Sequence, residues 1–266
     1  MCELFALSSK APATATLSLE TFAAHGGDSA PNKDGWGVAY FEDGDVRRLR
    51  DSGAAFTSPW VRFVEEQGLS STVVVSHIRK ATVGEVALRN TQPYCRELGG
   101  RMHVFAHNGH VPDVEGSRKF ALGAFHPVGE TDSEHAFCAL LQRVADAGTD
   151  GVLPPRETLI EVVASFAADL RALGPANFIY SDGEVLIAHG HRRRQSDGNF
   201  GAPGLHTLCR QCAGIDAPVS GGGLTVASPR QQVTLVASVP LTDEAWTPLG
   251  EGELLALEAG HILAAA

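Results

Sequence analysis

The sequence has no apolar run that approaches the roughly 20 residues a membrane-spanning helix needs. It also begins without the basic segment and the long apolar segment of a secretory signal. These two absences predict a cytoplasmic protein with no membrane partner. Lysine and arginine together number 21 and aspartate and glutamate 31, so the formal net charge is −10. Because an excess of negative charge opposes binding to phosphate backbones, we expect no nucleic-acid partner.

Cysteine is scarce, and its odd count of five in a chain without an export signal argues against a disulfide framework. Cys209 and Cys212 have C-x-x-C spacing, but no second pair and no nearby histidine pair completes a zinc site. His103 and His107 would lie on one face of a strand, roughly 13 Å apart, which is too far for one metal ion. His110 does not shorten that span. We therefore expect neither a metal nor a cofactor.

Apolar and turn-forming residues indicate a globular chain with many short strands. Hydrophobic residues make up 44% of the sequence, which is enough for a sizeable core, and glycine occurs 29 times. Strands spread over the whole chain, with helices between them, predict a single α+β domain of antiparallel sheets over residues 2–266. The short basic run 191–194 is interpreted as a solvated loop. The expected helices are 17–24, 59–68, 135–147 and 156–173, and the expected strands are 3–7, 36–41, 46–50, 72–78, 102–107, 177–181, 184–189, 224–227, 233–239 and 253–258.

Cys2 is the first residue with chemistry to consider. Methionine aminopeptidase removes Met1 when residue 2 is small, and its removal would leave a thiol and a free α-amine on one residue. The α-amine has a pKa of about 7.7–8.0 and the thiol one of about 8.5. At neutral pH the amine is therefore able to act as the base for its own side chain. The alternative is an ordinary second residue, held in place by a strand that begins at Glu3.

Two segments that follow predicted strands carry polar groups. Arg79 comes directly after strand 72–78, where its guanidinium is able to fork onto a carboxylate, and Thr82 adds a hydroxyl. Asn108 and Gly109 follow the next strand, where a side-chain amide and a backbone N–H would both donate to one oxyanion. The alternatives are a surface arginine and an ordinary Asn-Gly turn.

Asp132 lies at the predicted start of a helix, within the capping-box pattern at 131–134. One interpretation is an acidic residue in the first turn, which the helix dipole favours. The other is an exposed carboxylate that holds the ammonium group of a ligand.

These segments occur together in an order that is typical of one family. The chain starts with Met1 and Cys2, and then has Asp-Gly-Trp-Gly at 34–37, the run 77–84, His-Asn-Gly at 107–109 and the pattern at 131–134. In this combination the sequence resembles the class II glutamine amidotransferases, a family of N-terminal nucleophile hydrolases. Within that family it resembles the small stand-alone bacterial proteins of the YafJ type. The segments that carry this closer likeness are 32–37, 90–93, 240–246 and 252–255.

The resemblance implies a four-layer αββα sandwich and a role for each matching residue. Cys2 would be the nucleophile, Arg79 and Thr82 would bind the α-carboxylate of glutamine, Asn108 and Gly109 would form the oxyanion hole, and Asp132 would bind the α-ammonium. The implied reaction is cleavage of the γ-amide of glutamine, or of another γ-glutamyl compound, through a thioester. Val83 departs from the sugar-phosphate amidotransferases, which commonly have histidine there.

No synthase domain follows these motifs in the sequence. We therefore expect either a separate ammonia-accepting synthetase chain or simple hydrolysis. Two other functions remain open. One is an N-terminal-cysteine hydrolase of other amides, of the bile-acid or penicillin acylase type, which would not need Arg79 and Asp132. The other is a non-catalytic regulatory partner that binds γ-glutamyl compounds.

Overall fold

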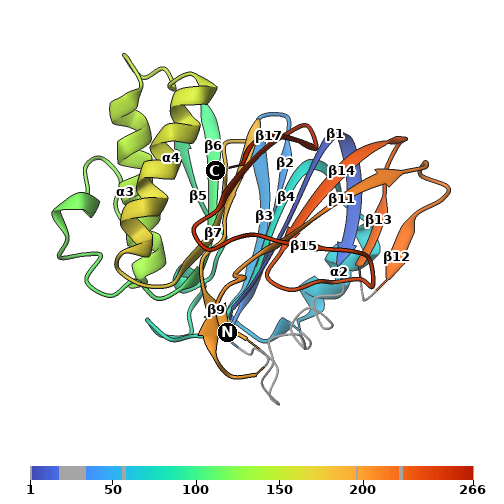
Figure 1. The fold of residues 1–266 in the computed structure, drawn as a ribbon, viewed down its shortest axis with the longest axis horizontal. Coiled ribbons are helices and arrows are strands. Elements are labelled where there is room, and N and C mark those ends of the chain that lie inside the picture. Colours follow the sequence, from blue (N-terminus) through green and yellow to red (C-terminus); the bar gives the residue numbers. More distant parts are fainter. Residues whose placement is uncertain (1, 18–33, 56–57, 196, 222–223, 266) are drawn as a thin grey trace.

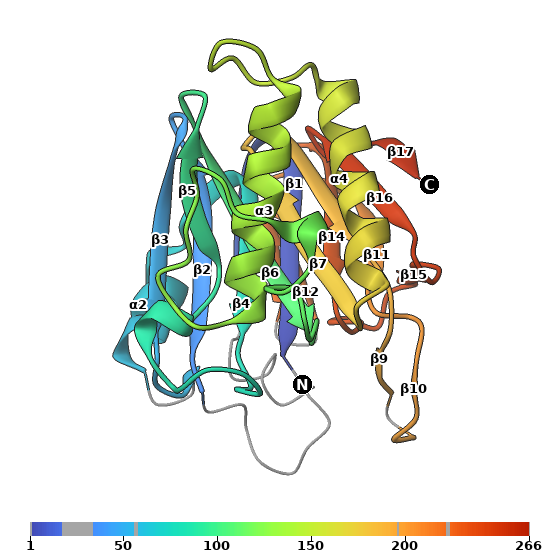
Figure 2. The same ribbon diagram turned by 90° about the vertical axis from the view of Figure 1, so that its left-hand side faces the viewer.

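Two β-sheets are stacked face to face in the computed structural model, which describes residues 2–17, 34–55, 58–195, 197–221 and 224–265. Helices α3 (Asp132–Ala147) and α4 (Arg156–Arg171) cover the outer side of one sheet, and the short helix α2 (Pro59–Gln67) packs against the other (Figures 1 and 2). The layers follow the order helix, sheet, sheet, helix. This arrangement confirms the predicted α+β sandwich of the αββα type.

The larger sheet contains nine strands among the described residues. They are β1 (Glu3–Leu17), β2 (Trp36–Glu42), β3 (Asp45–Asp51), β4 (Ser70–Ile78), β11 (His206–Cys212), β12 (Val219–Gly221), β13 (Leu224–Ala227), β14 (Gln231–Ala237) and β15 (Thr247–Pro248). The main order is β15-β11-β14-β1-β4-β2-β3, and β13 joins β12 to the far end of β1. Strand β1 is therefore internal, and it runs antiparallel to both β4 and β14.

The smaller sheet faces helices α3 and α4. Its strands are β5 (Tyr94–Leu98), β6 (Arg101–Gly109), β7 (Ala176–Ser181), β8 (Val185–His189), β16 (Leu254–Glu258) and β17 (His261–Ala265), in the order β17-β16-β8-β7-β6-β5. A separate hairpin pairs β9 (Arg193–Arg194) with β10 (Phe200–Gly201). Two 3-10 turns, η2 (Leu88–Asn90) and η3 (Arg118–Phe120), complete the described elements. In the described part of the chain, no helix is long and apolar enough to cross a membrane.

Alternation along the strands separates three apolar cores. On β1, Leu4 faces the core between the two sheets, and Phe5 faces the outer core that includes α2. On β6, Val104 faces the core between the sheets, and Phe105 packs toward α3 and α4. Successive side chains of a strand point to opposite faces, so each of these strands contributes to two cores at once.

The predicted helix ends are largely confirmed. The side chain of Thr131 accepts the backbone N–H of Glu134 at 3.2 Å, as a capping residue does. Helix α2 is followed by Gly68, whose φ of 54° is favoured by glycine. The helix expected over 17–24 lies outside the described residues, except for Leu17, which ends β1.

One edge of the sandwich brings the start of the chain close to several strand ends. Glu3 pairs with Ile78, so β1 begins where β4 ends, and Trp36 at the start of β2 pairs with the same residue. In the facing sheet, β6 ends at Gly109 and packs against β1 and β4. Antiparallel pairing thus places Cys2 beside the residues that follow β4 and across from the end of β6.

Candidate active site

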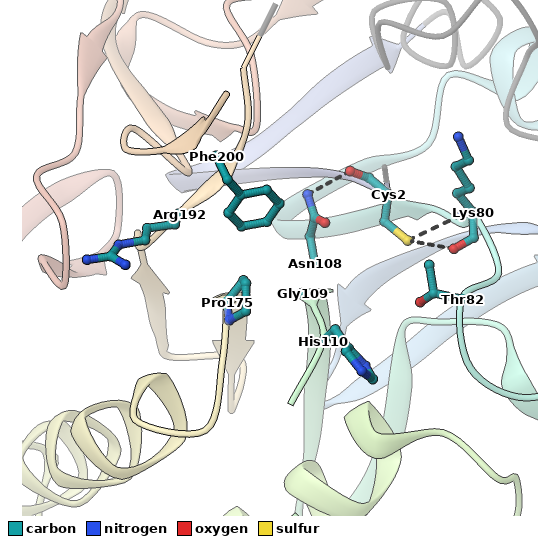
Figure 3. A pocket seen from close by; sticks show the side chains of 9 residues that line it. All are labelled: Cys2, Lys80, Thr82, Asn108, Gly109, His110, Pro175, Arg192 and Phe200. Atoms are coloured by element: carbon teal, nitrogen blue, oxygen red, sulfur yellow. Dashed lines mark hydrogen bonds between the residues drawn. The ribbon is translucent and has the colours of Figure 1, made fainter. Parts of the chain in front are cut away.

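Cys2 lines a pocket of about 150 Å³ at this edge (Figure 3). The pocket brings together four of the six residues that the sequence singled out. The described residues that line it are Cys2, Lys80, Thr82, Asn108, Gly109, His110, Pro175, Arg192 and Phe200, so Arg79 and Asp132 are not among them.

The thiol of Cys2 is held between main-chain atoms of Lys80. The backbone N–H of Lys80 donates to Sγ at 3.2 Å, and the thiol donates to the Lys80 carbonyl oxygen at 3.4 Å. Burial raises the pKa of the Cys2 thiol, and the hydrogen bond from Lys80 opposes this effect. Because the thiolate is the reactive form, a nucleophile in this setting needs a base beside it. Met1, whose removal would free the α-amine, lies outside the described residues.

Asn108 lies next to the main chain of Cys2. Its side-chain amide donates from Nδ2 to the Cys2 carbonyl oxygen at 2.6 Å (Figure 3). The carbonyl oxygen of Asn108 accepts a hydrogen bond from Nδ2 of Asn177 at 2.9 Å, and the two residues are paired across β6 and β7. The ordinary Asn-Gly turn is therefore not formed, because both residues belong to a strand.

Gly109 occupies a position where no side chain fits. A Cβ atom there would lie 1.8 Å from the carbonyl oxygen of Pro175 and 2.6 Å from Nε2 of His107. These contacts require glycine, since real Cβ atoms do not approach other heavy atoms so closely. The lack of a side chain leaves the backbone of Gly109 at the pocket wall.

Arg79 is buried beneath the loop that follows β4, and the residue is 3% exposed. Its Nη2 donates to the carbonyl oxygens of Val83 and Gly84 at 2.9 and 3.3 Å. Its Nη1 donates to those of Glu85 and Asp34 at 3.1 and 3.3 Å. The surface-arginine alternative is therefore wrong, because this guanidinium organises the loop next to Thr82.

Asp132 holds the start of α3 against the segment that follows β6. Its Oδ2 accepts the backbone N–H of Val111 at 2.9 Å and lies 3.3 Å from Nδ1 of His110, and its Oδ1 accepts the N–H of Ser133 at 2.8 Å. The carboxylate is mostly buried, and His110 connects it to the pocket.

Each buried histidine of β6 contacts a hydroxyl group through Nδ1. His103 contacts the hydroxyl of Tyr180 through Nδ1 at 2.7 Å, and His107 contacts the hydroxyl of Ser133 through Nδ1 at 2.8 Å. In the part of the chain that the structure describes, no three histidine, cysteine or acidic side chains are grouped as metal ligands would be. Cys209 is exposed and Cys212 is buried, and neither is disulfide-bonded.

The basic run expected to be a solvated loop is partly buried, and the interpretation needs correction. Arg192 and Arg194 are exposed, but Arg193 is buried because side chains of the short strand β9 alternate. Arg193 donates from Nη2 to Oε1 of Glu3 at 2.7 Å and from Nη1 to the Ser238 carbonyl oxygen at 2.6 Å. This buried ion pair connects the residue after Cys2 to the β9–β10 hairpin. No local pattern in the sequence indicates this long-range pairing.

The ion pair predicts a pH dependence of stability. Burial raises the pKa of Glu3 from its ordinary 4.5 to about 7, against the opposing attraction of Arg193. The folded protein therefore binds this proton more tightly than the unfolded chain. The stability that the neutral carboxyl contributes is complete below about pH 4.5 and is lost as the pH rises through about 7. The difference corresponds to about 3 kcal/mol.

Glu3→Gln keeps the shape of the neutral carboxyl and removes the titration. We expect the variant to match the wild type in free energy of unfolding near pH 4.5. Above pH 8 we expect it to be more stable than the wild type by about 3 kcal/mol, because the wild type has then lost the contribution of the neutral carboxyl. Urea denaturation at both pH values measures the difference. A difference that does not change with pH would contradict this account.

The fold of this chain resembles that of a known amidotransferase, although the two sequences have little identity. A glutamine phosphoribosylpyrophosphate amidotransferase from B. subtilis superimposes with a TM-score of 0.57 at 13% identity, over 99% of this chain and 48% of that one. The two stacked sheets covered by helices define a protein with the αββα sandwich fold, which this chain shares with that amidotransferase.

Closer similarities identify the family. The model for class II glutamine amidotransferases matches residues 1–266. The putative glutamine amidotransferase YafJ of Escherichia coli (strain K12) is 36% identical over 256 residues, which are 95% of this chain and 96% of that protein. A predicted glutamine amidotransferase from Pseudomonas aeruginosa PA01 has a TM-score of 0.71 at 34% identity, over 98% of this chain and 99% of that one. The chain belongs to the class II glutamine amidotransferase family, as its motifs predicted.

Proposed function

We propose that this protein is an amidohydrolase that cleaves the γ-amide of glutamine or of another γ-glutamyl compound. The observation that carries the proposal is the shared pocket, which Cys2 lines together with Asn108 and Gly109, and in which the Asn108 amide donates to the Cys2 carbonyl oxygen. A thiol, a side-chain amide and a peptide N–H at one pocket are the groups that acyl transfer needs. Family membership supports amide-transfer chemistry.

In the proposed reaction, the α-amine of Cys2 takes the thiol proton, directly or through a water. The thiolate attacks the γ-carbonyl carbon, and the oxyanion that forms is stabilised by donors from Asn108 and Gly109. The C–N bond breaks, and the departing amine leaves with the proton. Water then hydrolyses the thioester, which yields glutamate and restores the thiol. The raised pKa of the Cys2 thiol fits this scheme, because it makes a base necessary.

We propose that Thr82, Arg79 and Asp132 recognise the glutamyl group. Thr82 already lines the pocket, and His110 bridges between the pocket and Asp132. Arg79 is occupied by backbone carbonyl oxygens of the loop that contains Val83. In this proposal a substrate α-carboxylate replaces some of these carbonyls, because a carboxylate is the stronger acceptor for a guanidinium.

The direct test is release of glutamate from glutamine and from γ-glutamyl amides by the purified protein. Hydrolysis of apolar amides without a glutamyl group, at equal or higher kcat/KM, would favour the other N-terminal-cysteine hydrolases. A labelled Cys2 without turnover of any γ-glutamyl amide would favour a regulatory binding protein. The mass of the mature chain shows whether Met1 is removed, and a retained Met1 would rule out the amine as the base.

Arg79→Lys is expected to raise KM for glutamine while the protein stays folded. The ammonium group of lysine is a compact charge, whereas binding of a carboxylate through two parallel hydrogen bonds needs the planar guanidinium of arginine. Loss of one partner of a desolvated charge pair typically costs about 2–5 kcal/mol, so we expect a rise of roughly 30-fold or more. Steady-state kinetics measure the effect. Arg156→Lys, at an exposed ion pair with Glu258, is the matched control and should leave KM unchanged. Equal KM and kcat in Arg79→Lys and the wild type would show that Arg79 does not bind the substrate.

We further propose that the reaction occurs in the cytoplasm, where any ammonia released is either set free or taken up by a separate synthetase chain. The comparison with B. subtilis glutamine phosphoribosylpyrophosphate amidotransferase supports the second possibility only by analogy, since this chain covers 48% of that protein. Ammonia transfer would be detected as incorporation of glutamine nitrogen into an acceptor when a candidate synthetase is added.

A further inference from the structure

The pocket has two chemically different sides. Thr82 and the main chain of Lys80 lie on one side of Cys2, and Pro175 and Phe200 lie on the other (Figure 3). The first side presents a hydroxyl and peptide groups. The second side presents mainly carbon atoms.

Arg192 belongs to the second side but does not bring its charge to the nucleophile. Its guanidinium points away from Cys2 (Figure 3), and its Nε donates to Oε1 of Glu251 at 2.8 Å. Phe200, by contrast, has 57% of its surface exposed although it lines the pocket. A large aromatic side chain left open beside a nucleophile is a surface that a ligand is able to cover.

The hairpin that carries Phe200 is fixed to the active site at several points. The ion pair between Arg193 and Glu3 connects it to the residue after Cys2. Asn177 donates from Nδ2 to the carbonyl oxygens of both Arg192 and Asn108, at 2.8 and 2.9 Å. The buried side chain of Asn177 thus connects β6, which carries Asn108, to Arg192, the residue just before the β9–β10 hairpin.

The hairpin is also braced internally. The side-chain amide of Gln195 donates from Nε2 to the carbonyl oxygen of Gly201 at 2.7 Å and to that of Pro203 at 3.1 Å. Binding surfaces perform best when the elements that carry them are held in place by such supporting contacts. Phe200 therefore lies on a wall of the pocket that these hydrogen bonds hold in place.

We propose that this wall binds the departing amine, and that Phe200 selects γ-glutamyl amides whose amine carries an apolar ring. The inference rests on the proposed function and specifies its substrate class. If the glutamyl group of the substrate binds on the side of Thr82, its scissile C–N bond lies at Cys2. The departing amine then lies on the opposite side, next to Phe200 and Pro175. Ammonia, the amine released from glutamine, is too small to contact either. Hydrolysis of the preferred substrate yields glutamate and the free amine, with water supplying the oxygen and the protons.

The test compares γ-glutamyl-2-phenylethylamide with γ-glutamyl-ethylamide, whose amines are both primary alkylamines and so leave in the same chemical way. For the wild type we expect kcat/KM to be about 10-fold or more higher for the phenyl compound, the usual gain from a hydrophobic contact. Phe200→Ala should remove this preference, so that its kcat/KM values for the two compounds lie within about twofold of each other. Phe200→Leu should retain part of it. Phe63→Ala, at an exposed phenylalanine of α2 that does not line the pocket, is the matched control.

The outcomes separate the two proposals. If the wild type hydrolyses γ-glutamyl amides but treats both compounds alike, the inference about Phe200 is wrong and the proposed function stands. Equal losses on both compounds in Phe200→Ala also overturn it, because they would reveal a general structural role. If the wild type hydrolyses no γ-glutamyl compound, the proposed function fails.

Discussion

Cys2→Ala is expected to reduce hydrolysis of glutamine and of γ-glutamyl-p-nitroanilide to the background rate, because no thioester forms without the thiol. The fold should be retained, since the side chain borders a pocket and its hydrogen bonds reach only the main chain of Lys80. Steady-state kinetics and circular dichroism measure the two properties. In the wild type, the glutamine-like diazoketone 6-diazo-5-oxo-norleucine should modify Cys2 once per chain and stop turnover.

Cys209→Ala is the matched control for this experiment, because Cys209 is an exposed thiol outside the pocket. The control should keep full activity and should still be labelled once. Labelling at Cys95, Cys138, Cys209 or Cys212, with Cys2 unmodified, would refute the assignment. Burial raises the pKa of Cys95 and Cys138 as it does that of Cys2, but neither carries the α-amine that we propose as the base, so neither thiol is expected to compete.

Asn108→Asp is expected to lower kcat by about 10²–10³-fold or more, which is the usual loss when one oxyanion donor is removed. Aspartate places a negative acceptor where the developing charge needs a donor, so the change should appear in kcat rather than in KM. Asn108→Ala should keep a residual rate, since a backbone donor at Gly109 is unaffected. Both variants are assayed with glutamine and γ-glutamyl-p-nitroanilide.

A second measurement separates charge stabilisation from positioning. The amide of Asn108 donates to the Cys2 carbonyl oxygen, so its loss could also displace the nucleophile. Alkylation of Cys2 by iodoacetamide requires the thiolate but forms no oxyanion. If Asn108 acts on the oxyanion, the alkylation rate of Asn108→Ala should equal that of the wild type. Equal kcat values in the wild type, Asn108→Asp and Asn108→Ala would show that Asn108 has a purely structural role.

The sequence predicted the parts of the fold that depend on local patterns. The capping box at 131–134 marked the start of α3, and the β-branched run at 72–78 marked β4. Strands β5 and β11 were missed, because their side chains mix charged, polar and apolar residues. The short strand β17 was also missed. Strand β1 was predicted too short, since polar residues such as Ser8 and Ser9 are buried in it by partners far along the chain.

The residues of the candidate site also fall into two groups, those that local sequence patterns indicate and those that they do not. Cys2, Thr82, Asn108 and Gly109 were predicted as site residues because they lie in motifs, and all four line one pocket. Phe200 belongs to a polar, glycine-rich stretch in which no pattern of period two or 3.6 marks it. Its place at the pocket follows from contacts between residues separated by more than a hundred positions, which sequence periodicity does not encode.

The internal position of β1 has a consequence for the order of assembly. The backbone N–H of Leu4 donates to Oγ of Ser238, 234 positions away, and Glu3 pairs with Arg193, 190 positions away. Such contacts form late, because the intervening chain must first be synthesised and closed into a loop. On the ribosome, the first strand therefore waits for β14 before its hydrogen bonds are complete. During this interval the terminus is accessible to an aminopeptidase, and the pocket of Cys2 is completed only when Pro175, Arg192 and Phe200 have emerged. We expect nascent chains that stop before residue 190 to have no hydrolytic activity.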